Sequence, residues 1–220
     1  MTMFSAEFNE TFLIVFTSLF ALVDPVGNAV IFASLTPTRS AHRRRMYAIK
    51  GVLIATMLLL GFMFLGEFFL QRLGISLAAL RTAGGILLLI MGIDMVFARH
   101  SGGTRTTDEE EQEALAQSEA REDISVFPLA TPLLAGPGAI GAMVLFHANA
   151  GESTEQQLAV IMALAAIMLT SLACLLASSY LQQVLGKTGM NVINRIMGVL
   201  LSALAVQFVF DGLAESGLFT

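Results

Sequence analysis

The pentapeptide DPVGN, residues 24–28, interrupts the first long apolar run of this chain, and the hexapeptide AGPGAI, residues 135–140, interrupts the fourth. Each places proline and glycine, which end or restart helices, inside a stretch long enough to cross a bilayer. A broken helix persists in a membrane where it lines a cavity or binds a ligand, because its freed backbone groups find no water. Two breaks in corresponding positions of two halves therefore predict a transport site where the halves meet.

The composition predicts a membrane protein. Of the 220 residues, 55% are hydrophobic and only 13% are charged, whereas a soluble domain usually carries about 25% charged residues. No basic patch with interleaved aromatic residues indicates nucleic-acid binding. The chain has no HExxH motif, P-loop or GxSxG motif, and its histidines lack metal-ligand spacing. We therefore expect no enzyme, no cofactor and no metal site.

Six apolar stretches of roughly 20 or more residues predict six transmembrane helices in an all-α fold. They are expected at 8–35, 47–70, 75–98, 124–148, 155–185 and 189–213, within a single integral membrane domain that covers 1–220. Glu7 and Glu10, rather than basic residues, precede the first apolar run. The N-terminal segment is therefore expected to be a retained helix and not a cleaved signal peptide.

Lysine and arginine predict the orientation of these spans. The loop after the first span is strongly basic, and the loops after the third and fifth spans also carry basic residues; together they hold Arg39, Arg43, Arg44, Arg45, Lys50, Arg99, Arg105, Arg121 and Lys187. The positive-inside rule places these loops in the cytoplasm and both termini outside. The third loop, about 99–123, is long and acidic. We expect a solvated connector there, and the alternative is a docking site for a cytoplasmic partner.

The two halves of the chain, about 8–98 and 124–213, resemble each other. Aligning Arg81 with Arg195 also aligns Gly84 with Gly198, and aligning the breaks places Pro25 opposite Pro137. Three spans per half is an odd number, so the two halves must have inverted orientations. This inverted repeat is the architecture of many secondary transporters.

Asp24 is the charged residue of the first break. It occupies the position of a helix N-cap, and Pro25 occupies the first helical position. The carboxylate is therefore expected to bond the amide of Val26 or Gly27. An acid inside a span is also a functional-site candidate. Three roles stay open for Asp24, namely a structural cap, a substrate ligand, and a coupling site for H⁺ or Na⁺.

The second break has no side chain at its cap position, because Gly136 stands there. The amides of Gly138, Ala139 and Ile140 are then expected to remain unpaired at the positive end of a half-helix dipole. Such an end is a ready anion site, and we expect it to bind a substrate carboxylate. Asn28, one turn after the first break, is expected to bond the same ligand.

Four charged residues within the third and sixth spans are also candidates. Arg81 and Arg195 lie near the starts of these spans, and Asp94 and Asp211 lie near their ends. These charges oppose the helix dipoles, so their partners must lie on other spans or in lipid headgroups. One interpretation is bracing between helices or snorkelling to the interface, and the other is a substrate or gating role.

Four segments resemble the MarC family, also called UPF0056, which is similar to a six-helix neutral amino acid transporter family. They are LFALVDPVGNAVIFASLT (19–36), RRRM (43–46), FPLATPLLAGPGAI (127–140) and INRIMGVLLSALAVQFVFDGL (193–213). The motif positions that carry over are Asp24, Pro25, Gly27, Asn28, Pro132, Gly136 and Pro137. The resemblance implies a bacterial-type inner-membrane protein with six spans from an inverted duplication. It also implies movement of small neutral amino acids such as glycine and alanine.

This chain departs from the family pattern at two positions. Val30 stands where family members often have a second proline, which predicts a milder first break. Thr131 stands where an aliphatic residue is usual, which adds a hydroxyl group near the expected site.

We therefore expect a secondary transporter that works by alternating access. Its substrate is expected between the breaks, near Asp24, Gly27, Asn28, Thr131 and Gly136, with its carboxylate on the amides that follow Gly136. One alternative is a passive channel or exporter for other small solutes, and another is a regulatory membrane protein that transports nothing. The expected partners are a small-molecule substrate and the lipid bilayer, and a homo-oligomer stays open.

Overall fold

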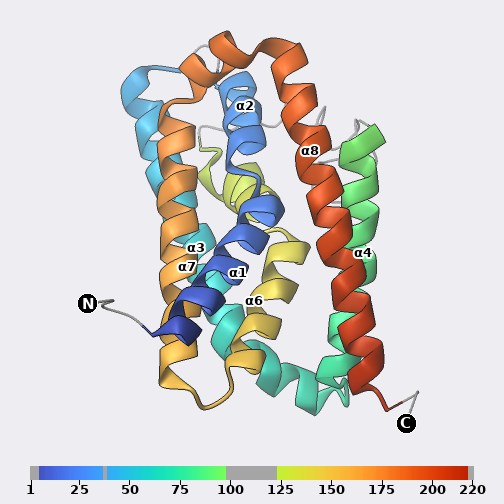
Figure 1. The fold of residues 1–220 in the computed structure, drawn as a ribbon. Coiled ribbons are helices and arrows are strands. Elements are labelled where there is room, and N and C mark those ends of the chain that lie inside the picture. The colour runs from blue at the N-terminus through green and yellow to red at the C-terminus, as the bar shows by residue number, and fades with distance from the viewer. Residues whose placement is uncertain (1–4, 37–38, 98–122, 218–220) are drawn as a thin grey trace.

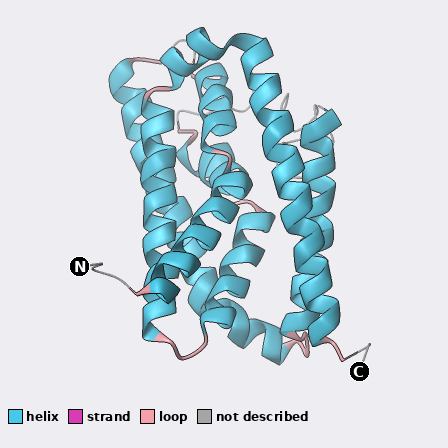
Figure 2. Ribbon diagram, viewed as in Figure 1, coloured by secondary structure: helices cyan, strands magenta, loops and turns pink. Residues whose placement is uncertain are grey.

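The computed structural model describes residues 5–36, 39–97 and 123–217, which form a bundle of helices (Figure 1). Figure 2 shows these helices joined by short loops, and the described residues contain no strand. The all-α fold class is therefore confirmed. In chain order the elements are α1 (Ala6–Val23), α2 (Pro25–Leu35), α3 (Ala41–Arg72), α4 (Leu77–Phe97), the π-helix η1 (Ser125–Leu134), α6 (Pro137–Ala150), α7 (Thr154–Leu176) and α8 (Ser178–Glu215).

Local sequence signals explain where several helices begin. Ser5, Ser40 and Ser153 each precede a helix and accept a hydrogen bond from an amide of its first turn. Serine is favoured at an N-cap because its hydroxyl oxygen satisfies an amide that has no partner within the helix.

The hydropathy of the helices agrees with several membrane crossings. Within the described residues, five helical stretches are long and apolar enough to span a bilayer, and α1 with most of α2, over Ala6–Ala33, counts as one of them. The pair η1 and α6, bent by 58° at its break, makes a sixth when it is taken as one span. The acidic loop expected at about 99–123 lies outside the described residues except for Asp123.

The expected boundary between the fifth and sixth spans was wrong. Helix α7 ends at Leu176, and α8 begins at Ser178 and continues through 186–188, where the turn between the two spans was expected. The gap between the predicted spans contains Gly186, but an isolated glycine costs a helix only about 1 kcal/mol and need not end it. The turn forms at Ala177 instead, whose amide bonds the Ala173 carbonyl at 2.9 Å. The first turns of α8 cross one end of the bundle before the helix descends beside α4 (Figure 1).

The two broken spans cross the bundle in opposite directions. Helices α1 and α2 pack on α7, whereas η1 and α6 pack on α3. The start of α1 and the end of α8 lie at the same end of the bundle as the α3–α4 and α6–α7 connections (Figure 1). The centre is apolar, with Leu19, Leu59, Met143 and Ile167 fully buried. Both breaks therefore lie inside a well-packed bundle.

Helices α4 and α8 approach each other through small residues. A Cβ atom added to Gly92 would lie 2.9 Å from the carbonyl oxygen of Gly198, and one added to Gly85 would lie 2.7 Å from that of Ala205. One added to Gly212 would lie 2.9 Å from the carbonyl oxygen of Ala78. Small residues allow this close approach, and packing of this kind drives association of helices in membranes. The two helices are therefore expected to behave as one rigid pair.

Replacing Gly92 with alanine is expected to destabilise the protein by about 1–3 kcal/mol, because the added methyl group meets backbone atoms of α8. The matched control is Gly61→Ala on α3, where nothing lies within 4 Å of the added carbon atom. Thermal unfolding in detergent micelles measures both variants. Equal melting temperatures would contradict the close approach of α4 and α8.

Candidate functional site

A single residue, Asp24, forms the first break. Its backbone is left-handed (φ 45°, ψ 67°), and its amide bonds the Phe20 carbonyl at 3.1 Å, which ends α1. Its Oδ1 atom accepts a hydrogen bond of 2.9 Å from the Gly27 amide, which caps α2. Aspartate tolerates the left-handed region better than most residues with a side chain. The structure thus gives Asp24 the capping geometry expected of it, at a break only one residue long.

The second break is longer and more sharply bent. Helix η1 contains non-helical backbone at Phe127 and Thr131, and the span resumes at Pro137 after a 58° bend. Gly136 is the N-cap of α6, and no side chain bonds the first turn of this helix. The contrast with the milder first break follows from the prolines at 128, 132 and 137, since the first span has only one.

One expected ligand of the second break needs correction. The Ile140 amide donates a 3.0 Å hydrogen bond to the Gly136 carbonyl, so it is not available to a substrate. The expectation failed because the helical bond pattern begins at the N-cap carbonyl, which already serves the fourth residue of the helix. The amides of Gly138 and Ala139 are the two in the first turn without a helical partner.

Asn28 joins the two breaks. Its Nδ2 group donates hydrogen bonds to the Val23 carbonyl at 2.6 Å and to the Leu133 carbonyl at 2.9 Å. These carbonyls lie at the ends of α1 and η1, where the helical pattern leaves acceptors unsatisfied. Asn28 is buried, with 6% of its surface exposed. Both of its donor hydrogens therefore serve the backbone, which leaves its Oδ1 atom as the one side-chain group it can offer to a ligand.

Helices α2 and α6 both begin at the middle of the bundle and run to opposite ends of it (Figure 1). Gly138 is half-buried, and a Cβ atom there would lie 3.1–3.4 Å from side-chain atoms of Leu22, Leu88 and Met91. The positive end of the α6 dipole therefore lies in apolar surroundings. Electrostatic attraction for an anion is stronger there than in water.

The remaining expected site residues have local partners. Gly27 is buried in the first turn of α2 and donates its amide to Asp24. The hydroxyl of Thr131 donates a long, 3.4 Å hydrogen bond to the Val126 carbonyl within its own helix. Thr131 is half-buried. Its hydroxyl is weakly engaged and lies on the segment that leads into the second break.

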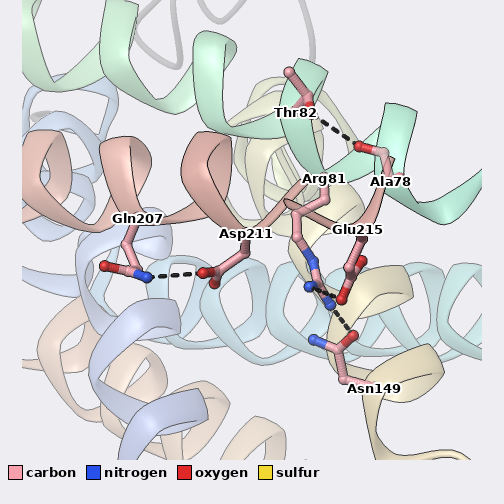
Figure 3. Close-up of polar contacts among 7 residues, drawn as sticks. All are labelled: Ala78, Arg81, Thr82, Asn149, Gln207, Asp211 and Glu215. Carbon is pink, nitrogen blue, oxygen red and sulfur yellow. Dashed lines mark hydrogen bonds and ion pairs between the residues drawn. The ribbon is translucent and has the colours of Figure 1, made fainter. Parts of the chain in front are cut away.

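Arg81 is the centre of a polar cluster at the end of the bundle that holds the termini (Figures 1 and 3). Its guanidinium group binds the carboxylate of Glu215 on α8 and the side-chain oxygen of Asn149 on α6. The Arg81 side chain is only 11% exposed, whereas that of Glu215 is 48% exposed. One arginine therefore ties the α4–α8 pair to the lower half of the second broken span.

The other three charged candidates lie outside this cluster. Asp211 accepts a 2.8 Å hydrogen bond from Gln207 on its own helix (Figure 3), Arg195 is exposed, and Asp94 is half-buried near the end of α4. The partner of Arg81 on α8 is Glu215, which sequence reasoning missed. Glu215 lies four residues after Asp211, so it extends the same helix face by one turn. That spacing is the signal that could have revealed it.

A second set of polar contacts lies at the opposite end of the bundle. Arg44 on α3 donates hydrogen bonds to the hydroxyls of Ser178 at 2.7 Å and Ser179 at 2.5 Å, at the start of α8. Its guanidinium carbon lies 5.9 Å from the centre of the Phe32 ring. This arginine therefore links α2, α3 and α8, and it was also missed as a bracing residue.

Lys50 and Asp123 form an ion pair between α3 and the start of η1. Burial raises the pKa of Asp123, but hydrogen bonds from Lys50 and Ser125 and the charge of Lys50 outweigh it and hold this pKa at about 2. Asp123 is therefore ionised at neutral pH. Among the described residues, no group of three histidine, cysteine or acidic side chains is placed to hold a metal ion.

Comparison with known proteins gives a family match over most of the chain. The description of the matching family is "MarC family integral membrane protein", and its model covers residues 9–216. A UPF0056 membrane protein of Methanocaldococcus jannaschii is 37% identical over 93% of this chain and 96% of its own length. The UPF0056 membrane protein YhcE of Escherichia coli is 35% identical over 90% of this chain and 89% of its own. YvbG of Bacillus subtilis, also a UPF0056 membrane protein, is 34% identical over 90% and 92%. No solved structure matches the chain significantly.

Exchange of Asn28 for aspartate is expected to destabilise the protein by at least about 2 kcal/mol, because a carboxylate would face two buried carbonyl oxygens that lose their donors. The control is Asn9→Asp, the same chemical change at an exposed position of the same span. Urea or thermal unfolding in detergent compares the two. A variant at Asn28 as stable as the control would show that the bridge between the breaks contributes nothing.

Proposed function

The chain belongs to the MarC family of integral membrane proteins, and we propose that it is a secondary transporter of small neutral amino acids that works by alternating access. One observation carries this proposal. Two half-helices begin at the centre of the bundle, a single asparagine bridges their breaks, and only one of their N-termini has a side-chain cap. Irregular backbone of this kind inside a membrane protein marks a binding site in many transporters.

A zwitterionic amino acid suits the charges around the two breaks. The amides of Gly138 and Ala139 at the start of α6 would hold its carboxylate, since they are oriented donors at a positive helix end. The half-buried carboxylate of Asp24 would hold its ammonium group or a coupling H⁺ or Na⁺. The Asn28 Oδ1 atom and the Thr131 hydroxyl supply further polar contacts. A small side chain follows from the close apolar surroundings of Gly138.

The packing of the helices supports an inverted repeat. Each broken span packs on the middle span of the other half, α1 and α2 on α7, and η1 and α6 on α3. Helix α2 contacts α8 as α6 contacts α4. An in-plane pseudo-twofold axis would produce this exchange. Rocking of one group of helices against the other would then expose the breaks to each side in turn.

In the proposed cycle, Arg81 and Arg44 would each hold one end of the helix bundle closed. Arg81 ties α4 to α6 and α8 at one end, and Arg44 ties α3 to α8 at the other. Alternating access requires the contacts at one end to break while those at the other hold. We propose that the Arg44 end faces the cytoplasm and that the Arg81 end and both termini lie on the outer side of the inner membrane; the basic residues after α2 support this orientation through the positive-inside rule.

Substitution of Gly136 by aspartate is expected to abolish exchange of labelled glycine, alanine and serine in proteoliposomes, because the new carboxylate would cap α6 and repel the substrate carboxylate. The backbone at Gly136 (φ −76°, ψ 165°) already has the extended conformation that a capping aspartate adopts. Counterflow against unlabelled amino acids measures the loss.

Gly136→Ala is the matched control, because it adds a carbon atom at the same place without an acceptor. It is expected to retain measurable exchange, and both variants must keep the melting temperature of the unaltered protein within a few degrees. Exchange by Gly136→Asp equal to that of the alanine variant would overturn the open half-helix site. Flux that never saturates would favour a channel, and no flux from the unaltered protein would favour a regulatory role.

A further inference from the structure

The first turns of α3 carry a surface that the proposed transport cycle does not use. We propose that this surface binds one phospholipid with a net negative headgroup. It is called the α3 patch here and consists of His42, Arg45 and Lys50 together with the apolar Met46, Leu53 and Met57. These residues border an open hollow of about 690 Å³. The proposal depends on the chain being a membrane protein and not on what it transports.

The basic end of the α3 patch suits a phosphate group. Arg45 is exposed, and within the described part of the chain its guanidinium group makes no hydrogen bond or ion pair. Arginine binds phosphate through two parallel hydrogen bonds, and it keeps its charge at any physiological pH. His42 lies three residues earlier, on the same helix face, and supplies a further ring donor. Lys50 already pairs with the ionised Asp123, so Arg45 is the main unpaired cation of the patch.

The apolar end of the α3 patch suits an acyl chain. Met46, Leu53 and Met57 are 47%, 54% and 70% exposed, and they follow Arg45 along one stripe of the helix. At a rise of about 1.5 Å per residue, the distance from Arg45 to Met57 along the helix is about 18 Å. One leaflet of the hydrocarbon core is about 15 Å deep. A lipid with its phosphate at Arg45 would therefore lay its chain along the rest of the stripe.

The length of α3 places the basic end at the headgroups. The helix has 32 residues, so it is about 48 Å long, whereas the hydrocarbon core is only about 30 Å thick. Residues 51–66 carry no charge, and Lys50 and Glu67 flank them. Lys50 thus marks one edge of the apolar region, and Arg45 and His42 lie one to two turns beyond it.

Charge complementarity selects a lipid over other occupants. A second copy of the chain that packed its own α3 patch against this one would present the same cations to Arg45, which is unfavourable. A soluble phosphate would leave the exposed Leu53 and Met57 without a partner. An anionic phospholipid satisfies both ends, and polybasic segments beside a span attract such lipids at about 1 kcal/mol per basic residue.

The test is Arg45→Gln in the full chain, reconstituted into nanodiscs that contain equal amounts of phosphatidylglycerol and phosphatidylcholine. Mild delipidation followed by mass spectrometry measures which lipid stays bound. The unaltered protein is expected to retain phosphatidylglycerol preferentially, and the variant is expected to lower that preference about fivefold. Amino acid counterflow is measured in parallel, so that a loss of transport and a loss of lipid are scored separately.

Arg72→Gln is the matched control, because Arg72 is an exposed arginine at the other end of the same helix, 5.2 Å from the Phe68 ring. It is expected to leave the lipid preference unchanged. Equal losses of the phosphatidylglycerol preference in both variants would show that the preference follows net charge alone, which would overturn the proposal. Absence of any preference in the unaltered protein would overturn it as well. Displacement of the lipid by glycerol 3-phosphate would show that the apolar stripe contributes nothing, which again contradicts a lipid site.

Discussion

A broken helix inside a membrane must find new partners for the amides and carbonyls that it releases, because the hydrocarbon offers none. This constraint organises the centre of the bundle. At the first break, Asp24 satisfies the Gly27 amide with its side chain and the Phe20 carbonyl with its own amide. The carbonyls of Val23 and Leu133 are satisfied by one buried amide group, that of Asn28. The break residues are therefore coupled, and neither span can shift its break without cost to the other.

The surrounding helices keep this centre in place. The α4–α8 pair, in contact through glycines, presents Leu88 and Met91 to the start of α6. Arginines fasten that pair to its neighbours at both ends: Arg81 of α4 binds Asn149 of α6 at one end, and Arg44 of α3 binds two serines of α8 at the other. A rigid pair that is fastened to its neighbours by separate polar contacts at its two ends can separate from them at one end while it stays joined at the other. This is the kind of element that a two-state conformational change requires.

Patterns that depend on local backbone chemistry were predictable from the sequence. The DPVGN motif predicted the Asp24 cap with the amide of Val26 or Gly27 as its donor, and the Gly27 amide is the one that bonds. The apolar runs predicted the helices. The turn between α7 and α8 was not predicted correctly, since the chain turns at Ala177 and α8 continues through the gap expected at 186–188. Contacts between residues distant in sequence were not predictable either, such as the hydrogen bonds of Asn28 with Leu133 and of Arg81 with Asn149. Neither pairing leaves a periodic signal along the chain.

The two halves have similar packing but different chemistry. Asp24 caps α2, whereas glycine leaves the corresponding end of α6 without a side chain. Arg81 is buried in a cluster, whereas Arg195, its counterpart in the sequence alignment of the halves, is exposed. A fully symmetric site would offer two equivalent positive helix ends and would bind an anion in either orientation. A capped end that bears a carboxylate, opposite an uncapped end, instead distinguishes the two poles of a zwitterion. In the proposed transporter, the difference between the two halves at these residues is therefore what would let the site hold an amino acid in one orientation.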